Sequence, residues 1–150
     1  MFIYGRPRRP VSNGMDPNKI TIYTDGGARG NPGPAAVGMV IGKNKYHEYI
    51  GETTNNVAEY KAVILALKKV VELFGEEAAQ KKILEINVDS ELLYKQDSGD
   101  YRVKDANLKV LFMEMRKMKK KFKTVNFKLV PREKNKEADK LVNEELDNLT

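Results

Sequence analysis

The sequence predicts an α/β fold in which helices pack on a mixed β-sheet. Runs of β-branched and aromatic residues alternate with amphipathic stretches, in the order three strands, helix, strand, two helices, strand, helix. The second and third strands meet around residues 42–44, which is typical of an antiparallel hairpin. The run 83–88 alternates little between apolar and polar residues, which is typical of an internal strand.

The first third of the chain predicts three strands. β-Branched and aromatic residues dominate 20–24, and the glycine-rich stretch 25–33 that follows is expected to be a turn. Residues 35–42 and 45–51 are the two arms of the hairpin. The sheet is therefore expected to open with antiparallel strands.

A long helix is predicted over residues 57–74. Its apolar side chains recur at helical spacing, at Tyr60, Ile64, Leu67 and Val71. This stripe predicts a helix that packs one face on the sheet.

The second half of the chain repeats the alternation. Strand 83–88 leads into a short helix from Ser90 to about Gln96, which the polar stretch 97–100 ends. A long helix over 105–121, a strand over 123–130 and a terminal helix over 135–149 follow. The positions expected to face inward on these two helices are Leu108, Leu111, Phe112, Met115, Met118, Phe122, Ala138, Leu141, Val142, Leu146 and Leu149.

Length and composition limit the class of protein. A chain of 150 residues fits one domain with its own core. Residues 1–18 are rich in proline and arginine and are expected to be an irregular arm, with the folded domain at 19–150. Without cysteine and with one histidine, the chain cannot form disulfides, a thiolate zinc site or a multi-histidine metal site.

The sequence is expected to contain neither a membrane span nor a secretory signal peptide. The apolar runs are too short to span a bilayer, and the N-terminus lacks the apolar core of a signal peptide. We therefore expect a cytoplasmic protein without a membrane partner, whose chemistry depends on carboxylates, hydroxyls or cations.

The net charge of +6 favours a polyanionic partner. Much of the excess is local, because the segment 109–123 has seven basic residues, Lys117 and Lys120 among them, against one acid, Glu114. A solvated helix face is the alternative interpretation of this segment.

Four acids stand at the ends of predicted elements, and each has a structural and a functional interpretation. Asp25 follows the first strand, where an aspartate often only forms a turn. Glu59 and Asn56 match a capping box at a helix N-terminus. However, Ala62 and Ala66 lie on the same helix face as Glu59, so this acid is expected to point at the sheet.

The other two acids are similar cases. Asp89 ends strand 83–88, where it or Ser90 would cap the next helix, but ligand sites of open α/β sheets gather at the carboxyl ends of strands. Asp139 would complement the dipole of a helix capped by Asn135, although its helix face continues inward to Val142.

Convergence of the four carboxylates would create strong repulsion, which a bound cation would relieve. Oxygen ligands of this kind suit Mg²⁺. Two Mg²⁺ ions about 4 Å apart would clamp a phosphodiester, so no covalent protein intermediate would be required.

Four motifs together resemble the type 1 ribonuclease H family over residues 19–148. They are Tyr23-Thr24-Asp25-Gly26-Gly27 with Gly30-Asn31-Pro32-Gly33, Thr53-Thr54-Asn55-Asn56 with Glu59, Val88-Asp89-Ser90, and Asn135 with Ala138-Asp139. Each motif alone is common, whereas their order and spacing are specific.

The resemblance implies a ribonuclease H-like fold with a five-stranded mixed sheet. It also implies endonucleolytic hydrolysis of the RNA strand of RNA/DNA hybrids with Mg²⁺ or Mn²⁺, leaving 5′-phosphate and 3′-hydroxyl ends. Asp25, Glu59, Asp89 and Asp139 would form the metal site.

The resemblance also implies substrate-binding residues. Asn31, Asn55 and Asn56 would approach the minor groove, where 2′-hydroxyls distinguish RNA from DNA. Thr54 would help to hold a phosphate of the DNA strand, and Gly26 belongs to the same set, to which we add Lys117 and Lys120. Helix capping and a tight turn are the structural alternatives for these motifs.

The chain departs from the family in two places. Many members have a histidine in the loop before the last aspartate, whereas residues 130–135 contain none, and Arg132 is our candidate substitute. Arginine cannot act as a general acid near neutral pH, so Arg132 would hold phosphate or product electrostatically. The lone His47 lies in a predicted strand and is expected to be structural or at the surface.

The second departure is length. Fifteen positions separate Asp89 from Lys104, too few for the extra helix and basic protrusion of several relatives. A compact form is implied, in which the lysine-rich helix would partly replace the protrusion and make binding sensitive to salt. Some compact relatives also cut double-stranded RNA.

The function predicted from the sequence is a monomeric, metal-dependent ribonuclease H. One alternative is a non-catalytic module that binds hybrids, against which four intact acids argue. Another is a DNA-cutting relative such as a resolvase or transposase core, against which the asparagines placed for 2′-hydroxyl contact argue.

Overall fold

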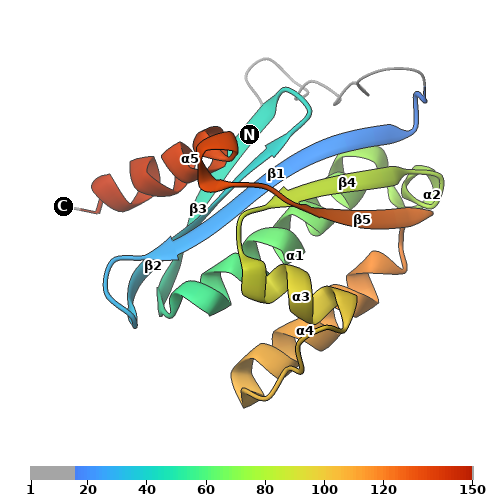
Figure 1. Cartoon of the computed structure of the whole chain (residues 1–150). Helices are drawn as coiled ribbons and strands as arrows, with labels where there is room; N and C mark the ends of the chain where they lie inside the picture. The colour runs from blue at the N-terminus through green and yellow to red at the C-terminus, as the bar shows by residue number, and fades with distance from the viewer. Residues whose placement is uncertain (1–15, 150) are drawn as a thin grey trace.

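The computed structural model describes residues 16–149 (Figure 1), so nearly all of the predicted arm 1–18 lies outside the described residues. Five strands form one sheet in the order β3-β2-β1-β4-β5. The strands are β1 (Lys19–Ala28), β2 (Gly33–Ile41), β3 (Asn44–Thr53), β4 (Ile83–Val88) and β5 (Thr124–Leu129). β2 pairs antiparallel with β1 and β3, whereas β4 is parallel to both β1 and β5. The predicted mixed α/β sheet is confirmed.

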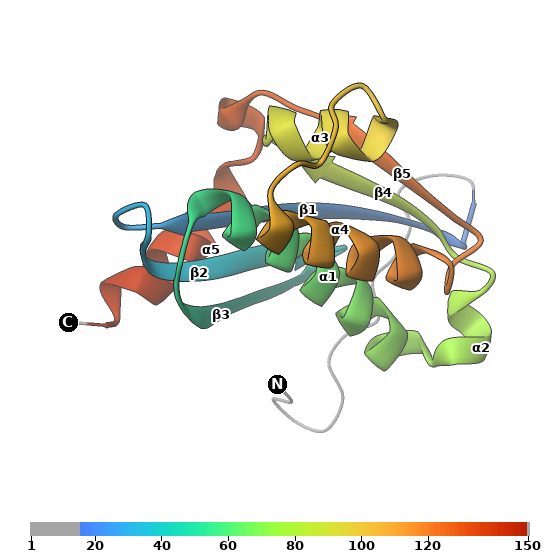
Figure 2. The same ribbon diagram turned by 90° about the horizontal axis from the view of Figure 1, so that it is seen from below.

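Helices cover both faces of the sheet. They are α1 (Asn55–Phe74), α2 (Glu76–Ala79), α3 (Glu91–Ser98), α4 (Ala106–Lys119) and α5 (Lys136–Asp147), with a 3₁₀ turn η1 (Arg132–Lys134) before α5. Seen from below in Figure 2, α1 lies in front of the sheet and α5 behind it. Every predicted helix is present, and the single turn α2 is an element that the sequence pattern did not reveal.

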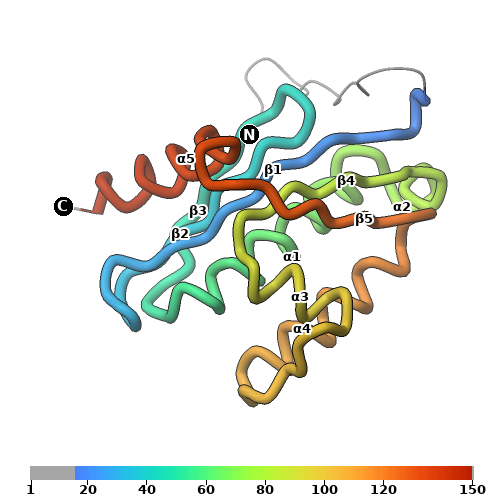
Figure 3. The backbone as a smooth tube through the Cα atoms, viewed as in Figure 1, coloured from blue at the N-terminus to red at the C-terminus, as the bar shows by residue number. Residues whose placement is uncertain are grey.

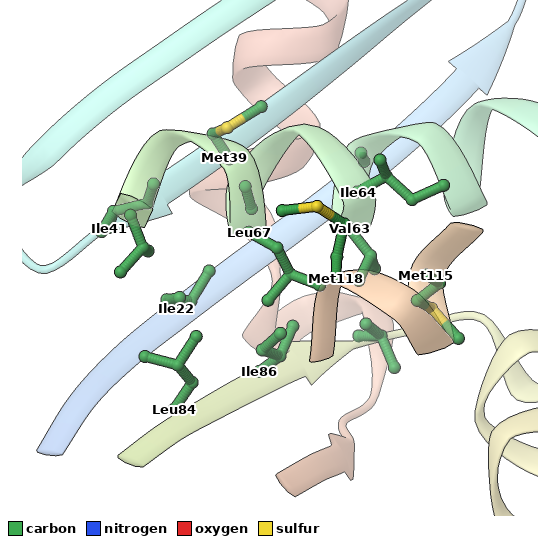
Figure 4. Packing of buried hydrophobic residues seen from close by; sticks show 14 of the residues in the cluster. Ile22, Met39, Ile41, Val63, Ile64, Leu67, Leu84, Ile86, Met115 and Met118 are labelled. Atoms are coloured by element: carbon green, nitrogen blue, oxygen red, sulfur yellow. The ribbon is translucent and has the colours of Figure 1, made fainter. Parts of the chain in front are cut away.

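The main core lies between the sheet and the helices α1 and α4 (Figure 4). Ile22 and Ile86 of the central strands meet Leu67 of α1, and Met115 and Met118 of α4 close the far side. Burial of side chains of this size contributes about 1.5–3 kcal/mol each relative to exposure. This packing fixes α1 against β1.

β1 is longer than predicted. The expected strand 20–24 continues through Ala28, so Asp25 lies within a strand and not in a turn. The reason is pairing with β2, which runs through Asp25 and Gly38 as far as Ala28 and Ala35. Tertiary pairing therefore overrides the low β-propensity of glycine here.

The capping-box interpretation of Asn56 and Glu59 is wrong. Thr54 is the N-cap of α1, and its Oγ1 accepts a hydrogen bond of 3.2 Å from the Val57 main-chain N–H. Glu59 is one turn further into the helix and has no capping function, which leaves its carboxyl for another role.

Between β4 and α4 the chain has room only for α3 and the short connection 99–105. The compact form without a basic protrusion is therefore confirmed. In the described part of the chain, no helix is both long enough and apolar enough to cross a bilayer.

Candidate active site

Four elements bring the acids to one cleft of about 420 Å³. Asp25 is on β1, Glu59 is on α1, Asp89 directly follows β4, and Asp139 is on α5. The backbone tube in Figure 3 shows how this is achieved, because the chain returns from β5 across the sheet and begins α5 on the side of β1 and β2. The structure thus places all four predicted acids together.

A glycine allows α1 to approach β1 closely enough to deliver Glu59. A Cβ atom on Gly26 would overlap the carbonyl oxygen of Ala58, the residue before Glu59. The Gly26 main chain also hydrogen-bonds to the Glu59 carboxyl. Gly26 is therefore required by close packing at the point where strand and helix present their acids.

The caps of the neighbouring helices leave Asp89 available to the site. Ser90 is the N-cap of α3, and its Oγ accepts a hydrogen bond of 3.1 Å from the Leu93 main-chain N–H. Asp89 and Ser90 were the two candidates for this cap, and Ser90 is the residue that caps the helix. Asp89 directs its carboxylate into the cleft instead.

Asn135 connects two of the elements that form the site. Its side chain is buried, and its Nδ2 donates to the Thr24 carbonyl at 2.9 Å and to Asp89 Oδ2 at 3.3 Å. Asn135 is the N-cap residue of α5, as predicted, but its side chain makes no capping bond. Its amide instead links β1 to the acid that follows β4.

Burial and mutual repulsion perturb the acids. Burial, followed by the charges of Asp89 and Asp139, raises the pKa of Asp25 from its ordinary 3.8 to about 8. Burial, followed by the charges of Asp25 and Asp89, raises the pKa of Glu59 well above its ordinary value. Without a counter-charge, Asp25 and Glu59 therefore tend to retain protons near neutral pH.

The donor set fits a hard divalent cation. Asp25, Glu59 and Asp89 each offer a carboxylate oxygen, and these atoms all lie within 4.8 Å of one another. Asp139 lines the same cleft. Oxygen ligands at this spacing suit Mg²⁺ or Mn²⁺, and a cation would remove the repulsion that raises the two pKa values.

Two arginines provide the positive charge among the described residues that line the cleft. Arg132 was predicted; its side chain is 83% exposed, and its Nη2 lies 3.9 Å from Asp139 Oδ1. Arg29 was not predicted, and it reaches α5 from the connection between β1 and β2. No periodic pattern marks Arg29 in the sequence, and only its nearness to Asp25 along the chain hints at it.

Of the three predicted asparagines, Asn55 lines the cleft and is hydrogen-bonded to Asn31. The Asn55 main-chain N–H donates to Asn31 Oδ1 at 3.0 Å, and Asn55 Oδ1 accepts from the Ala28 N–H at 2.8 Å. These bonds fasten the β1–β2 connection to the start of α1. Asn55 lines the cleft, and Asn56 beside it is exposed.

The predicted lysines lie elsewhere. Lys117 and Lys120 are exposed, at the outer surface and the C-cap of α4, and do not line the acidic cleft. His47 is on the edge strand β3, where its Nδ1 lies 2.7 Å from Glu145 Oε1. It is outside the cleft, as expected of a surface residue.

Comparisons with known proteins place this geometry in a family. The family described as reverse transcriptase-like matches residues 23–145. The bifunctional protein Rv2228c of Mycobacterium tuberculosis is 38% identical over 136 residues, which are 86% of this chain and 36% of that protein. The ribonuclease HI of Halobacterium salinarum is 37% identical over 135 residues, which are 86% of this chain and 65% of that protein. The chain thus spans only part of these relatives.

Solved structures of ribonucleases H1 resemble this chain in fold. LC11-RNase H1 in complex with an RNA/DNA hybrid has a TM-score of 0.81 and 45% identity, over 87% of this chain and 98% of that chain. RNase H1 from Halobacterium salinarum has a TM-score of 0.79 and 38% identity, over the same shares. The five-stranded sheet, the acidic cleft and these similarities establish that the chain belongs to the type 1 ribonuclease H family.

Proposed function

We propose that this chain is a metal-dependent endoribonuclease that hydrolyses the RNA strand of RNA/DNA hybrids. The observation that carries the proposal is the convergence of Asp25, Glu59, Asp89 and Asp139 in one cleft of a ribonuclease H fold. The name of its structural neighbour, an RNase H1 in complex with an RNA/DNA hybrid, supports hybrid as the substrate. Products with 5′-phosphate and 3′-hydroxyl ends are part of the proposal.

The four acids would hold the metal. Asp25 is central, because its carboxyl interacts with both Glu59 and Asp139 and is repelled by Asp89. When bound, two Mg²⁺ ions, or Mn²⁺ in their place, would polarise the scissile phosphate and activate water. The surrounding residues orient the four carboxylates. Asn135 keeps the Asp89 carboxylate turned toward the cleft through its hydrogen bond to Oδ2.

Arg132 would hold phosphate or product at the mouth of the cleft. Its guanidinium is highly exposed beside Asp139, and arginine is the side chain best suited to bind phosphate as a cation. It therefore supplies charge where many relatives have a histidine, without proton transfer.

The asparagines would hydrogen-bond to the sugar hydroxyls in the minor groove of the hybrid. Asn31 and Asn55 use their Oδ1 atoms inside the protein. The remaining Nδ2 donors, together with the exposed Asn56, would face 2′-hydroxyls and base edges. Contacts of this kind predict weak sequence preference, and they favour RNA over DNA on the cleaved strand.

Thr54 would contact the DNA strand, and Lys117 and Lys120 would bind the hybrid through their charge. The Thr54 hydroxyl accepts a bond from its own helix, yet it can still donate its proton to a phosphate, so capping and binding are compatible. The two lysines add positive potential on α4 and would make binding sensitive to salt.

The proposal is tested with end-labelled duplexes. Wild-type protein is incubated with RNA/DNA, RNA/RNA and DNA/DNA duplexes in Mg²⁺, Mn²⁺ or EDTA, and the product ends are mapped. We expect metal-dependent cutting of RNA in the hybrid. The RNA/RNA duplex tests whether the protein also cuts double-stranded RNA. Binding of the hybrid without cutting would favour the binding module, and cutting of DNA would favour a resolvase or transposase core. A monomeric state and a cytoplasmic location stay predictions.

A further inference from the structure

Arg29 is a charged residue of the cleft to which the proposed function gives no role. It reaches across from the β1–β2 connection to α5, where its Nη2 lies 2.6 Å from Asp147 Oδ1 and 3.5 Å from Asn143 Oδ1. Asn143 in turn donates through Nδ2 to the main-chain carbonyl of Asp139. Arg29 is thus linked to the helix that carries one of the acids.

Stability does not account for this arginine. The side chains of Arg29 and Asp147 are 46% and 66% exposed, and ion pairs at such positions contribute little to folding. Both of its contacts with α5 use the same terminal nitrogen, Nη2. The guanidinium has five N–H donors, so it can be oriented by α5 and still present other donors to a ligand.

The chemistry of the cleft requires cations beside the acids. A strand that passes the four carboxylates has a phosphate on each side of the scissile one, and those flanking charges lie next to an acidic wall. A planar guanidinium binds phosphate with paired hydrogen bonds and is well suited to offset this repulsion. Among the described residues that line the cleft, Arg29 and Arg132 are the cations.

The two arginines lie toward different ends of α5. Arg132 is beside Asp139, in the first turn, whereas Arg29 is beside Asp147, the last residue of the helix. Eight residues of helix correspond to about 12 Å. That distance is comparable with three to four base steps of a duplex at about 3.4 Å each. The pair can therefore contact phosphates on opposite sides of the acids.

We propose that Arg29 binds a phosphate of the RNA strand that flanks the scissile phosphate, on the side away from Arg132. Asp147 and Asn143 orient its guanidinium from behind. The inference rests on the proposed function and adds a substrate-binding residue to the same cleft.

The test compares Arg29→Ala and Arg29→Lys with Lys43→Ala. Lys43 is an exposed lysine in the β2–β3 turn, at the end of the sheet opposite the cleft, so it controls for loss of one positive charge. Steady-state cleavage of hybrid gives kcat and KM. Binding to hybrid is measured from about 50 to 200 mM salt on the Asp25→Asn background.

Arg29→Ala is expected to raise KM about tenfold with little change in kcat, since it removes a charged hydrogen bond to phosphate. The slope of log affinity against log salt should fall by about 0.7–0.9. Arg29→Lys should recover part of the affinity, because it retains the charge but not the fork. Equal KM and slope for Arg29→Ala and Lys43→Ala would overturn the inference.

The Asp147→Asn variant distinguishes a phosphate-binding role of Arg29 from a purely structural role. It keeps an oxygen acceptor for Arg29 but removes a negative charge near the bound phosphate, so KM should fall by up to about threefold. A rise in KM and a loss of melting temperature equal to those of Arg29→Ala would show that Arg29 is only a brace. Failure of wild-type protein to cut hybrid would contradict the proposed function instead.

Discussion

The side-chain amide of Asn135 donates a hydrogen bond to the Asp89 carboxylate, with 3.3 Å between Nδ2 and Oδ2. The same nitrogen donates to the main-chain carbonyl of Thr24, the residue before Asp25. The main-chain carbonyl of Asn135 accepts the first helical hydrogen bond of α5, from the N–H of Asp139. One buried side-chain amide therefore links the strand that carries Asp25 to the Asp89 carboxylate.

Replacing this amide should disturb both the fold and the site. Asn135→Ala is expected to lower the free energy of unfolding by about 1–3 kcal/mol, because it leaves buried polar groups unsatisfied. It should also reduce kcat/KM for hybrid at least about tenfold, since a small misplacement of a catalytic group is costly. Chemical denaturation and cleavage of hybrid would measure the two effects.

The matched control is Asn126→Ala, on exposed β5 and outside the cleft, which should change neither quantity appreciably. Full activity in folded Asn135→Ala would show that the asparagine does not position the acids.

Gly26 and Gly27 provide a neighbouring pair with opposite expectations. A Cβ on Gly26 would overlap the Ala58 carbonyl, whereas one on Gly27 would lie 3.5 Å from Val142 Cγ1, an ordinary contact. Gly26→Ala should therefore push α1 away from β1 and cost at least about 1–3 kcal/mol, as overpacking does. Gly27→Ala should stay within about 1 kcal/mol of wild type. Comparable melting temperatures for the two variants would contradict the close packing.

These glycines also illustrate what the sequence can predict. Helical periodicity located α1, α4 and α5, and motif order identified the four acids and the family. The turn expected at Asp25 was wrong, because pairing with β2 decides the strand's length and local propensity does not. Arg29 and the bonding of Asn135 were missed, since both depend on contacts with residues distant in the chain.

The raised pKa of Asp25 predicts a pH-dependent stability of the metal-free protein. Because the folded-state pKa of about 8 exceeds the ordinary 3.8, the native state binds the extra proton between these values. The contribution of Asp25 to the free energy of unfolding is therefore greatest below pH 3.8. It is lost as the pH rises toward 8. Asp25→Asn should remove most of this dependence and raise the metal-free melting temperature at pH 8.

Metal provides the complementary test. Mg²⁺ binds the native state, so it should raise the melting temperature of wild-type protein at pH 8, and much less that of Asp25→Asn. A stabilisation of about 2 kcal/mol would correspond to roughly 4–8 °C. Melting curves of both proteins at several pH values, with Mg²⁺ or EDTA, measure this. Equal shifts in the two proteins would place the cation elsewhere.

Arg132 should contribute to activity and not to stability. Its side chain is 83% exposed, so Arg132→Ala should leave the melting temperature unchanged. We expect kcat/KM to fall about tenfold through loss of a charged contact, with partial recovery in Arg132→Lys. Steady-state cleavage of hybrid measures this.

His47→Ala is the control for Arg132. It removes the only histidine and should leave kcat/KM within about twofold, since His47 contacts Glu145 outside the cleft. A larger loss for His47→Ala than for Arg132→Ala would contradict the assignment of Arg132.

The most direct test of the central claim is hybrid cleavage by wild-type and Asp25→Asn protein at equal occupancy of substrate. Both proteins are first shown to bind the same labelled RNA/DNA hybrid, and RNA cutting is then followed after addition of Mg²⁺. We predict that wild type cuts the RNA strand and that Asp25→Asn binds it but loses at least about a thousandfold in rate. Equal cutting by the two proteins, or none by wild type under any metal, would contradict a catalytic role for the acidic cleft.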